Sequence, residues 1–373
     1  MRLERKSVKR LGAAGGILAM LAVAGVWTVQ AQAPEPIAHI SGDSDVDAAS
    51  LRAAIEPLFD DAVGETRALI VMHDGEIVAE RYAPGFGPQT KLLAWSAAKS
   101  VTAVLVGLMV ADGRLALDSP APVPAWGQPG DPRGRITLRQ LLSMTSGLDH
   151  VEDAEPLAQA DTVRMLFTDG AQDMGAFAEA KPLAHKPGSV FSYSTGSTMI
   201  LTDLMTRMLT GSTDPDVRRR AMQMFVDGRL KIPARLPSLT VEYDAAGTMI
   251  GGSFLHMTAR DYARFGELLR NHGRGVAGHQ IVPEKWIDYM RAPSPRNAAY
   301  GAHIWLNKDS EESALMPGRA PGSLFGCVGH DGQYILVSPA QRLTVVRLGM
   351  SPAREEREAV KDGLAKLVGL FPR

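Results

Sequence analysis

The segment Ser96-Ala97-Ala98-Lys99 places a hydroxyl and an amine three residues apart at the start of a long apolar run. Residues with this spacing share one face of a helix, so the amine of Lys99 can reach the hydroxyl of Ser96. The free N–H groups of a first helical turn favour a developing oxyanion. The apolar neighbours exclude water from Lys99 and lower its pKa, so that a neutral amine can accept the serine proton. This pattern predicts a nucleophilic serine with a lysine base.

The same four residues also fit a helix cap followed by a surface lysine, because a sequence this short arises by chance in many chains. That alternative is weak here. Lys99 is the only charged residue that the expected helix carries before Asp112, whereas a surface helix has a charged face.

A tyrosine stands in a second polar segment, Phe191–Gly196, which follows the turn Lys186-Pro187-Gly188. Placed between Ser96 and a leaving group, the hydroxyl of Tyr193 can pass the proton on, either as a phenolate stabilised by Lys99 or as a shared donor. The structural alternative is a tyrosine packed where a loop meets a helix.

A third segment, Gly329-His330-Asp331-Gly332-Gln333, leads directly into the apolar run that begins at Tyr334. Because Gly332 has no side chain, a ligand can lie against the strand edge there. The N–H of Gln333 is then the candidate for a second oxyanion donor beside the N–H of Ser96. The structural alternative is a tight turn before a strand, which Asp-Gly often forms.

The remaining segments predict the elements that hold these residues in place. Two β-rich runs, residues 67–73 and 76–82, flank Asp-Gly and predict a hairpin. Further strands are expected at residues 301–307, 323–329, 333–337 and 343–348. Helices are expected at residues 51–63, 96–111, 138–144 after the cap Thr137, 198–209, 261–271 after the cap candidate Thr258, and 353–370.

Consecutive strands with short links favour an antiparallel sheet covered by helices. Neither end of the chain completes such a sheet alone. We therefore expect one α/β (α+β) domain over residues 50–373, preceded by a polar leader at residues 32–49. The sheet part takes about 50–110 and 300–373, and a mainly helical subdomain of about 111–299 is inserted between them.

Composition narrows the classes of protein. Of the 373 residues, 45% are apolar and 22% are charged, as in a soluble globular protein, and a net charge of −1 does not provide the basic surface that a nucleic-acid partner requires. The single cysteine, Cys327, excludes an internal disulfide and a cysteine zinc site, and we expect it to be a small buried hydrophobe rather than a reactive thiol.

The sequence lacks the motifs that identify two other classes of hydrolase. No G-x-S-x-G is present, which argues against an α/β-hydrolase triad. The nine histidines show no metal-ligand spacing, so we expect neither a metal nor another cofactor. Four of these histidines are expected to be surface or packing residues: His256, His272, His279 and His303.

The N-terminus has the pattern of an export signal. Five basic residues precede the apolar stretch Leu11–Val29, and small residues follow it. Cleavage after Ala31 is favoured over cleavage after Ala33, because Pro34 would follow the second cut. The alternative is an uncleaved membrane anchor, since about 19 apolar residues can just span a bilayer. We expect residues 1–31 to be removed and the mature protein to be periplasmic or secreted.

Together the three segments resemble the serine β-lactamase and penicillin-binding protein superfamily, whose set is S-x-x-K, a second Tyr- or Ser-based motif and K-T-G. Residues 136–148, residues 258–266 and the pair Tyr300-Gly301 before Trp305 resemble this family as well. The resemblance covers about 50–372 and implies a β-lactamase/transpeptidase-like fold. It also implies a set of roles: Ser96 as the nucleophile, Lys99 and Tyr193 as the proton-transfer pair, and the N–H groups of Ser96 and Gln333 as the oxyanion hole.

Two departures from the family's pattern separate its branches. The Tyr-x-Asn of class C β-lactamases is Tyr193-Ser194-Thr195 here, so the amide that holds a lactam side chain is missing. K-T-G is His330-Asp331-Gly332, so a histidine replaces the permanent cation that pairs with a substrate carboxylate. Three of these positions are therefore substrate-binding candidates: Thr195, His330 and Gly332. The chain is most similar to carboxylesterases with the β-lactamase fold and to 6-aminohexanoate-oligomer hydrolases.

This resemblance implies an exported serine hydrolase that cleaves a small-molecule ester or a linear amide through an acyl-enzyme on Ser96. One alternative is β-lactamase or D,D-peptidase activity, with an arginine such as Arg319 holding the substrate carboxylate. A second is a non-catalytic penicillin-binding-like module, which has no need of all three residues Ser96, Lys99 and Tyr193. A membrane is a partner only if the signal stays uncleaved, and the oligomeric state is unspecified.

Overall fold

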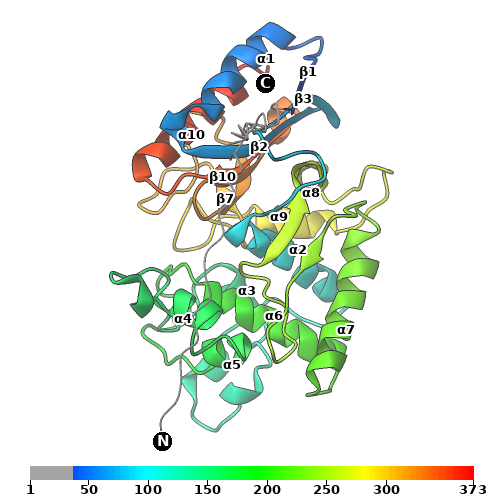
Figure 1. The fold of residues 1–373 in the computed structure, drawn as a ribbon. Coiled ribbons are helices and arrows are strands. Elements are labelled where there is room, and N and C mark those ends of the chain that lie inside the picture. Colours follow the sequence, from blue (N-terminus) through cyan, green and yellow to red (C-terminus); the bar gives the residue numbers. More distant parts are fainter. Residues whose placement is uncertain (1–36) are drawn as a thin grey trace, which may run out of the picture. The chain divides into compact units, whose positions relative to one another are not determined.

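The computed structural model describes residues 37–373, so the predicted export signal lies outside the described part (Figure 1). Within residues 37–373, no helix is both long and apolar enough to cross a membrane. The described part begins inside the predicted polar leader with a strand, β1 (Ile37–Ile40), which pairs with β3 (Glu76–Tyr82). Residues 37–40 of the polar leader therefore contribute a strand to the sheet, and this strand was not predicted.

A seven-stranded antiparallel sheet forms one layer of residues 37–373, in the order β1-β3-β2-β10-β9-β8-β7. The predicted hairpin is confirmed as β2 (Glu65–His73) and β3. At the centre of the sheet, β2 pairs with the C-terminal strand β10 (Leu343–Met350), so both ends of the chain complete it, as predicted. The remaining strands are β7 (Trp305–Leu306), β8 (Phe325–Gly329) and β9 (Gln333–Ser338).

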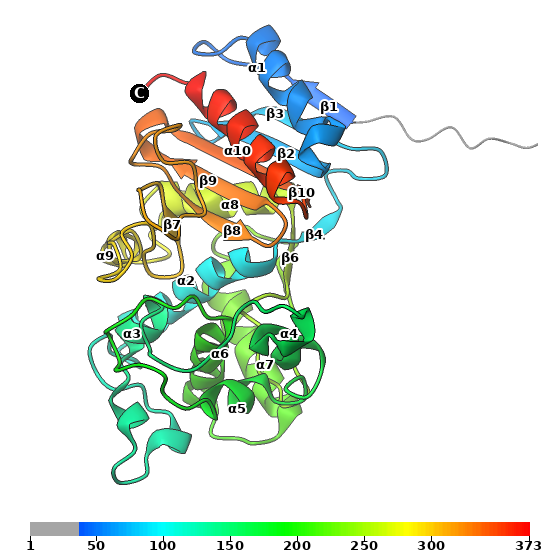
Figure 2. The same cartoon turned by 90° about the vertical axis from the view of Figure 1, so that its left-hand side faces the viewer.

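Helices cover both faces of this sheet (Figure 2). On one face lie α1 (Ala48–Ile55) and α10 (Arg354–Gly369), and on the other lies α8 (Ala259–Arg270). Alternate residues of β2 enter the two cores, because successive strand side chains point to opposite faces. By its packing α8 belongs to the sheet, although its residues lie within the range 111–299 that we assigned to the helical subdomain.

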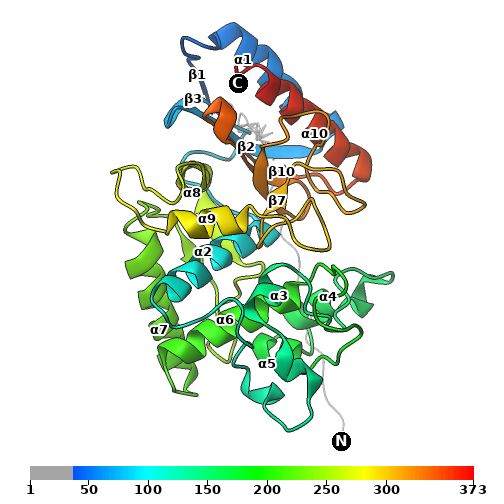
Figure 3. The same cartoon turned by 180° about the vertical axis from the view of Figure 1, so that it is seen from behind.

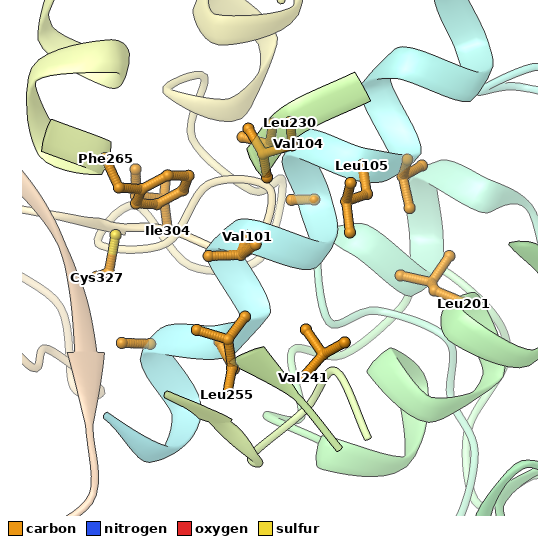
Figure 4. Packing of buried hydrophobic residues seen from close by; sticks show 14 of the residues in the cluster. Val101, Val104, Leu105, Leu201, Leu230, Val241, Leu255, Phe265, Ile304 and Cys327 are labelled. Carbon is orange, nitrogen blue, oxygen red and sulfur yellow. The ribbon is translucent and has the colours of Figure 1, made fainter. Parts of the chain in front are cut away.

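Helix α2 (Ala98–Ala111) lies between the sheet and the helical part of the chain (Figures 2 and 4). A short 3-10 helix, η3 (Trp95–Ala97), precedes it, and every residue from Ala98 to Met109 is buried. Figure 4 shows side chains from several elements around α2, among them Leu201, Leu255 and Phe265. A helix that is apolar on all sides is stable only in such a position, as its sequence predicted.

The helical part holds α3 (Leu138–Leu142), α4 (Asp161–Phe167), α5 (Met174–Glu179), α6 (Thr195–Leu209) and α7 (Pro215–Val226) (Figure 3). The predicted cap Thr137 accepts from the N–H of Gln140, and α6 starts at Thr195, three residues earlier than expected, because Ser194 caps it. Another helix, α9 (Glu284–Met290), packs on α2. There Trp286 Nε1 donates a hydrogen bond to the carbonyl of Ala103 at 3.0 Å.

A second, three-stranded sheet was not predicted. Its order is β4-β6-β5, from β4 (Lys91–Leu93), β6 (Leu255–Thr258) and β5 (Thr240–Val241). Runs of two to four residues are too short to show the alternation that identifies a strand. This small sheet matters for function, because β4 leads into η3 and β6 follows the segment 252–254, so the pairing holds these two segments side by side.

Candidate active site

Ser96 and Lys99 meet as their spacing predicts. Ser96 lies in η3, and the Nζ of Lys99 donates a hydrogen bond to its Oγ at 2.8 Å. The backbone N–H of Ser96 has no hydrogen-bond partner among the described residues, as is usual for the first turn of a helix. The serine thus has a nitrogen base at its hydroxyl and a free N–H beside it.

Three oxygen atoms surround the amine of Lys99, which is buried. Besides Ser96 Oγ, it donates to Thr195 Oγ1 at 2.8 Å and to the carbonyl of Gly252 at 2.9 Å. Burial lowers the pKa of Lys99 to about 8, although the negative charges of Glu152 and Asp153 oppose this change. A lysine with this pKa is partly neutral at mildly alkaline pH and can then accept a proton.

A mostly buried carboxylate, that of Glu152 with 18% of its side chain exposed, stands behind Thr195. It accepts from the Thr195 N–H at 2.6 Å and from the Thr195 hydroxyl at 2.6 Å. Burial raises the pKa of Glu152, but the hydrogen bond with His150 and the charge of Lys99 lower it more strongly, to about 2. Lys99, Thr195 and Glu152 therefore form a hydrogen-bonded chain that ends in an ionised carboxylate.

This chain changes the role that we expected for Thr195. Its side chain is buried, and its hydroxyl already accepts from Lys99 and donates to Glu152, so it is not available to a substrate. The prediction of a substrate contact at Thr195 does not fit the structure. Glu152 itself was missed, because it is one of several acids between residues 149 and 155, and no pattern distinguishes it from the others.

His150 and Thr162 complete the surroundings of Glu152. The Thr162 hydroxyl donates to Glu152 Oε2 at 2.8 Å, and His150 Nε2 lies 3.2 Å from the same oxygen. Gly196 packs against the imidazole, where an added Cβ would lie 2.8 Å from Nδ1. The start of α6 is therefore fitted closely around the Glu152 carboxylate.

Tyr193 lies beside the Ser96–Lys99 pair. Its ring centroid is 5.0 Å from Lys99 Nζ, and the ring stacks on Trp305 at 5.7 Å. Burial raises the pKa of the Tyr193 hydroxyl far above its ordinary value, and the hydrogen bond with Ser96 opposes this only in part. The phenol is thus neutral, which favours the shared-donor role over the phenolate role that the sequence left open.

The third predicted segment forms the turn between β8 and β9. Gly329 at the end of β8 contacts the segment before Ser96 so closely that an added Cβ would overlap the carbonyl oxygen of Ala94. Gln333 lies one strand farther into the sheet, where it pairs with Gly329 and its amide donates to the carbonyl of Gly349 at 2.6 Å. Because Gln333 lies on β9 and β8 contacts the segment before Ser96, the N–H groups of β8 beyond its pairing with β7 are a second candidate for the oxyanion donor, and the role of the Gln333 N–H stays a prediction.

Gly332 and His330 also differ from expectation. Gly332 has a φ of 84°, and its carbonyl accepts from Arg347 Nη1 at 2.9 Å, so the turn itself requires the glycine, whereas we predicted room for a ligand. The His330 side chain is 67% exposed, with Nε2 3.3 Å from Asp331 Oδ1, and its ring meets Trp95 edge-on at 5.8 Å. His330 therefore lies at the rim of the site, next to the residue that precedes the nucleophile.

Three other residues named in the sequence analysis are held by ion pairs, burial or hydrogen bonds outside the Ser96–Lys99 pair. Arg319 pairs with Glu358 and Asp362 of α10, so it is not free to hold a substrate carboxylate. Cys327 is buried, which raises the pKa of its thiol to about 12. His303 is buried as well; burial lowers its pKa to about 3, and its ring nitrogens contact the carbonyl of Leu142 and the hydroxyl of Thr198.

The geometry can support acyl transfer. A serine oxygen contacts a lysine with a lowered pKa, a neutral phenol lies next to both, and the Ser96 N–H has no partner among the described residues. Within residues 37–373, no group of His, Cys, Asp or Glu side chains is arranged to hold a metal ion. The reaction that this arrangement fits is attack of a serine on a carbonyl carbon.

Comparisons with known proteins agree with the resemblance read from the sequence. The Beta-lactamase family model matches residues 51–370. The 6-aminohexanoate-dimer hydrolase of Paenarthrobacter ureafaciens is 24% identical over 311 residues, 78% of this chain and 74% of that protein. Esterase EstB of Burkholderia gladioli is 33% identical over 174 residues, 40% of this chain and 43% of that protein. A solved family VIII carboxylesterase shares the fold at 16% identity, with a TM-score of 0.60 over 88% of this chain and 100% of its own.

The chain from Lys99 to Glu152 predicts a pH effect. Only the neutral amine accepts the serine proton, so the rate at which a fluorophosphonate labels Ser96 is expected to rise with pH through about 8, the pKa of Lys99. Because the charge of Glu152 raises the pKa of Lys99, Glu152→Gln is expected to move the midpoint of this rise to lower pH. The measurement is the labelling rate between pH 5 and 10, read by mass spectrometry.

Asp153→Asn is the matched control. Asp153 is an exposed neighbour that also raises the pKa of Lys99, but less than Glu152 does. The midpoint of the labelling rate in Asp153→Asn is therefore expected to move to lower pH by a smaller amount than in Glu152→Gln. An unchanged midpoint in Glu152→Gln would show that the carboxylate does not influence the amine.

Proposed function

Because the chain belongs to the Beta-lactamase family of serine hydrolases, we propose that it is an exported enzyme that cleaves a small ester or a linear amide through an acyl-enzyme on Ser96. The observation that carries this proposal is the 2.8 Å hydrogen bond from a buried lysine with a lowered pKa to the serine hydroxyl. Similarity to an esterase and to an amide hydrolase supports the choice of bonds.

Acylation follows from the contacts around Ser96. Neutral Lys99 takes the hydroxyl proton while Oγ forms a bond to the carbonyl carbon, and the carbonyl electron pair moves onto oxygen. The N–H of Ser96 and a second N–H, from β8 beyond its pairing with β7 or from Gln333, stabilise that oxyanion. As the oxyanion collapses, the bond to the leaving group breaks, and the leaving oxygen or nitrogen takes a proton from the Tyr193 hydroxyl, which Lys99 reprotonates.

Deacylation uses the same groups in reverse. A water molecule gives its proton through Tyr193 to Lys99, its oxygen adds to the acyl carbon, and the bond to Ser96 Oγ breaks as Oγ regains a proton. The chain through Thr195 to Glu152 holds the amine in place during both steps, so that Lys99 does not turn away when it becomes charged.

The central test measures acyl-enzyme formation on the mature protein. p-Nitrophenyl acetate is expected to give a burst, and fluorophosphonate to label the protein, and both signals are expected to vanish in Ser96→Ala. Lys99→Ala is expected to lower the acylation rate by about 10²–10⁴-fold, because removal of a general base has this effect.

Lys285→Ala on the exposed side of α9 is the matched control and is expected to leave the rate unchanged. A loss below about tenfold in Lys99→Ala would point to another base. Absence of both burst and labelling in the unmodified protein would favour the non-catalytic binding module.

Esters are expected to be better substrates than cephalosporins. A lactam brings a side-chain amide and a carboxylate, but the Thr195 hydroxyl is engaged, His330 is a rim histidine and Arg319 is paired on α10. A missing charged hydrogen bond lowers transition-state binding by about ten- to a hundredfold. We therefore expect kcat/KM for p-nitrophenyl butyrate to exceed that for nitrocefin, and an equal or higher value for nitrocefin would contradict this assignment.

Export is proposed from the N-terminal pattern alone. Basic residues, an apolar stretch and Val29-Gln30-Ala31 support removal of residues 1–31. The protein purified from the periplasm of a host bacterium is expected to begin at Gln32 when its N-terminus is sequenced. Retention of Met1 would instead indicate a membrane-anchored enzyme.

A further inference from the structure

Trp95 directly precedes the nucleophile in an unusual backbone conformation. Its φ is 47°, in the left-handed region that bulky residues rarely adopt, so its neighbours must hold it there. The indole is only half-buried, and it meets the His330 ring at 5.8 Å and the Phe254 ring at 5.9 Å, both edge-on. A large, half-exposed apolar side chain is thus fixed directly beside Ser96.

Two phenylalanines extend this apolar surface away from Ser96. Phe254 follows Gly252, whose carbonyl accepts from Lys99, and its ring lies 5.7 Å from that of Phe167 at the end of α4. Phe167 is 56% exposed. We call Trp95, Phe254 and Phe167 the aromatic row. It runs from the nucleophile to the surface in steps of about 6 Å between ring centroids.

The aromatic row and Tyr193 lie among different neighbours. Tyr193 contacts Trp305 and Tyr300, at 5.7 and 5.8 Å between centroids, whereas the row contacts His330. Because Tyr193 protonates the leaving oxygen, the leaving group departs on the Tyr193 side. The acyl chain then lies on the opposite side, against the aromatic row. This argument rests on the proposed function, since it uses the role assigned to Tyr193.

We propose that the aromatic row binds the acyl chain of the substrate and that this chain is apolar and several carbons long. The three rings offer no charge and no hydrogen-bond acceptor to a polar acyl group. A row of this length accommodates a chain well beyond acetyl, and each CH₂ that it removes from water raises kcat/KM by about fourfold. The preferred substrates are therefore medium-chain esters rather than acetates.

The test compares two ester series. In p-nitrophenyl esters from acetate to decanoate, the acyl chain grows while the leaving group stays fixed, and in alkyl acetates from methyl to octyl only the alcohol grows. For the unmodified protein, kcat/KM is expected to rise with acyl length and to change little with alcohol length. Phe167→Ala and Phe254→Leu are expected to reduce the decanoate-to-acetate ratio at least tenfold, with the larger effect on the longest chains.

Met224→Ala is the matched control, because Met224 is a large exposed apolar residue on α7, at 74% exposure, and is not part of the row. It is expected to leave the ratio unchanged. Because Phe167 is 56% exposed, the Phe167→Ala variant is expected to fold normally. A changed ratio in this variant therefore reports on substrate binding and not on a loss of folded protein.

Three outcomes would overturn the assignment: no rise with acyl length in the unmodified protein, an unchanged ratio in both row variants, or an effect confined to the alkyl acetates, which would place the alcohol on the row. Failure of the proposed function gives a different result, because no variant would then hydrolyse acetate in a Ser96-dependent way.

Discussion

Burying the amine of Lys99 is the constraint on which the site depends. A buried ammonium needs oxygen partners, and this one has Ser96 Oγ, Thr195 Oγ1 and the carbonyl of Gly252. A carboxylate in direct contact would hold the proton on the amine. Here the carboxylate of Glu152 is set back behind the Thr195 hydroxyl, so its charge supports the ammonium without preventing its deprotonation. The spacing by one hydroxyl is what keeps Lys99 able to act as a base.

This constraint requires distant parts of the chain to converge. Lys99 comes from α2, Thr195 and its partner Glu152 come from the inserted helical part, Gly252 comes from the segment before β6, and Gly329 comes from the sheet. Helix α2 can lie among all of them because it carries no charge between Lys99 and Asp112. Its apolar sides are buried against both parts of the molecule, and the only charge on its buried length is the one that the site uses.

The extent to which the sequence predicts this site depends on how local each signal is. Ser96 and Lys99 are set by one helical turn, and the hairpin β2–β3 by Asp74-Gly75, so both could be predicted. Glu152 lies in a loop among other acids, and only the tertiary structure brings it to Thr195. The sequence could not show that Gln333 lies on β9 while β8 contacts the segment before Ser96, because a motif does not reveal which strand faces the serine. Strands of two or three residues, such as β4 and β5, carry no periodic pattern at all.

The pairing of β2 with β10 has a consequence for how the chain is made. Residues 65–73 leave the ribosome, or enter the periplasm if the protein is exported, long before residues 343–350. Until the last strand arrives, β2 and β3 have an unpaired edge, and β8 and β9 have nothing to join them to the hairpin. The central pairing joins residues far apart in the sequence, and contacts of this kind form more slowly than local ones. Since β8 contacts the segment before Ser96, the nucleophile is fully positioned only after synthesis is almost complete, so an incomplete chain does not carry the finished site.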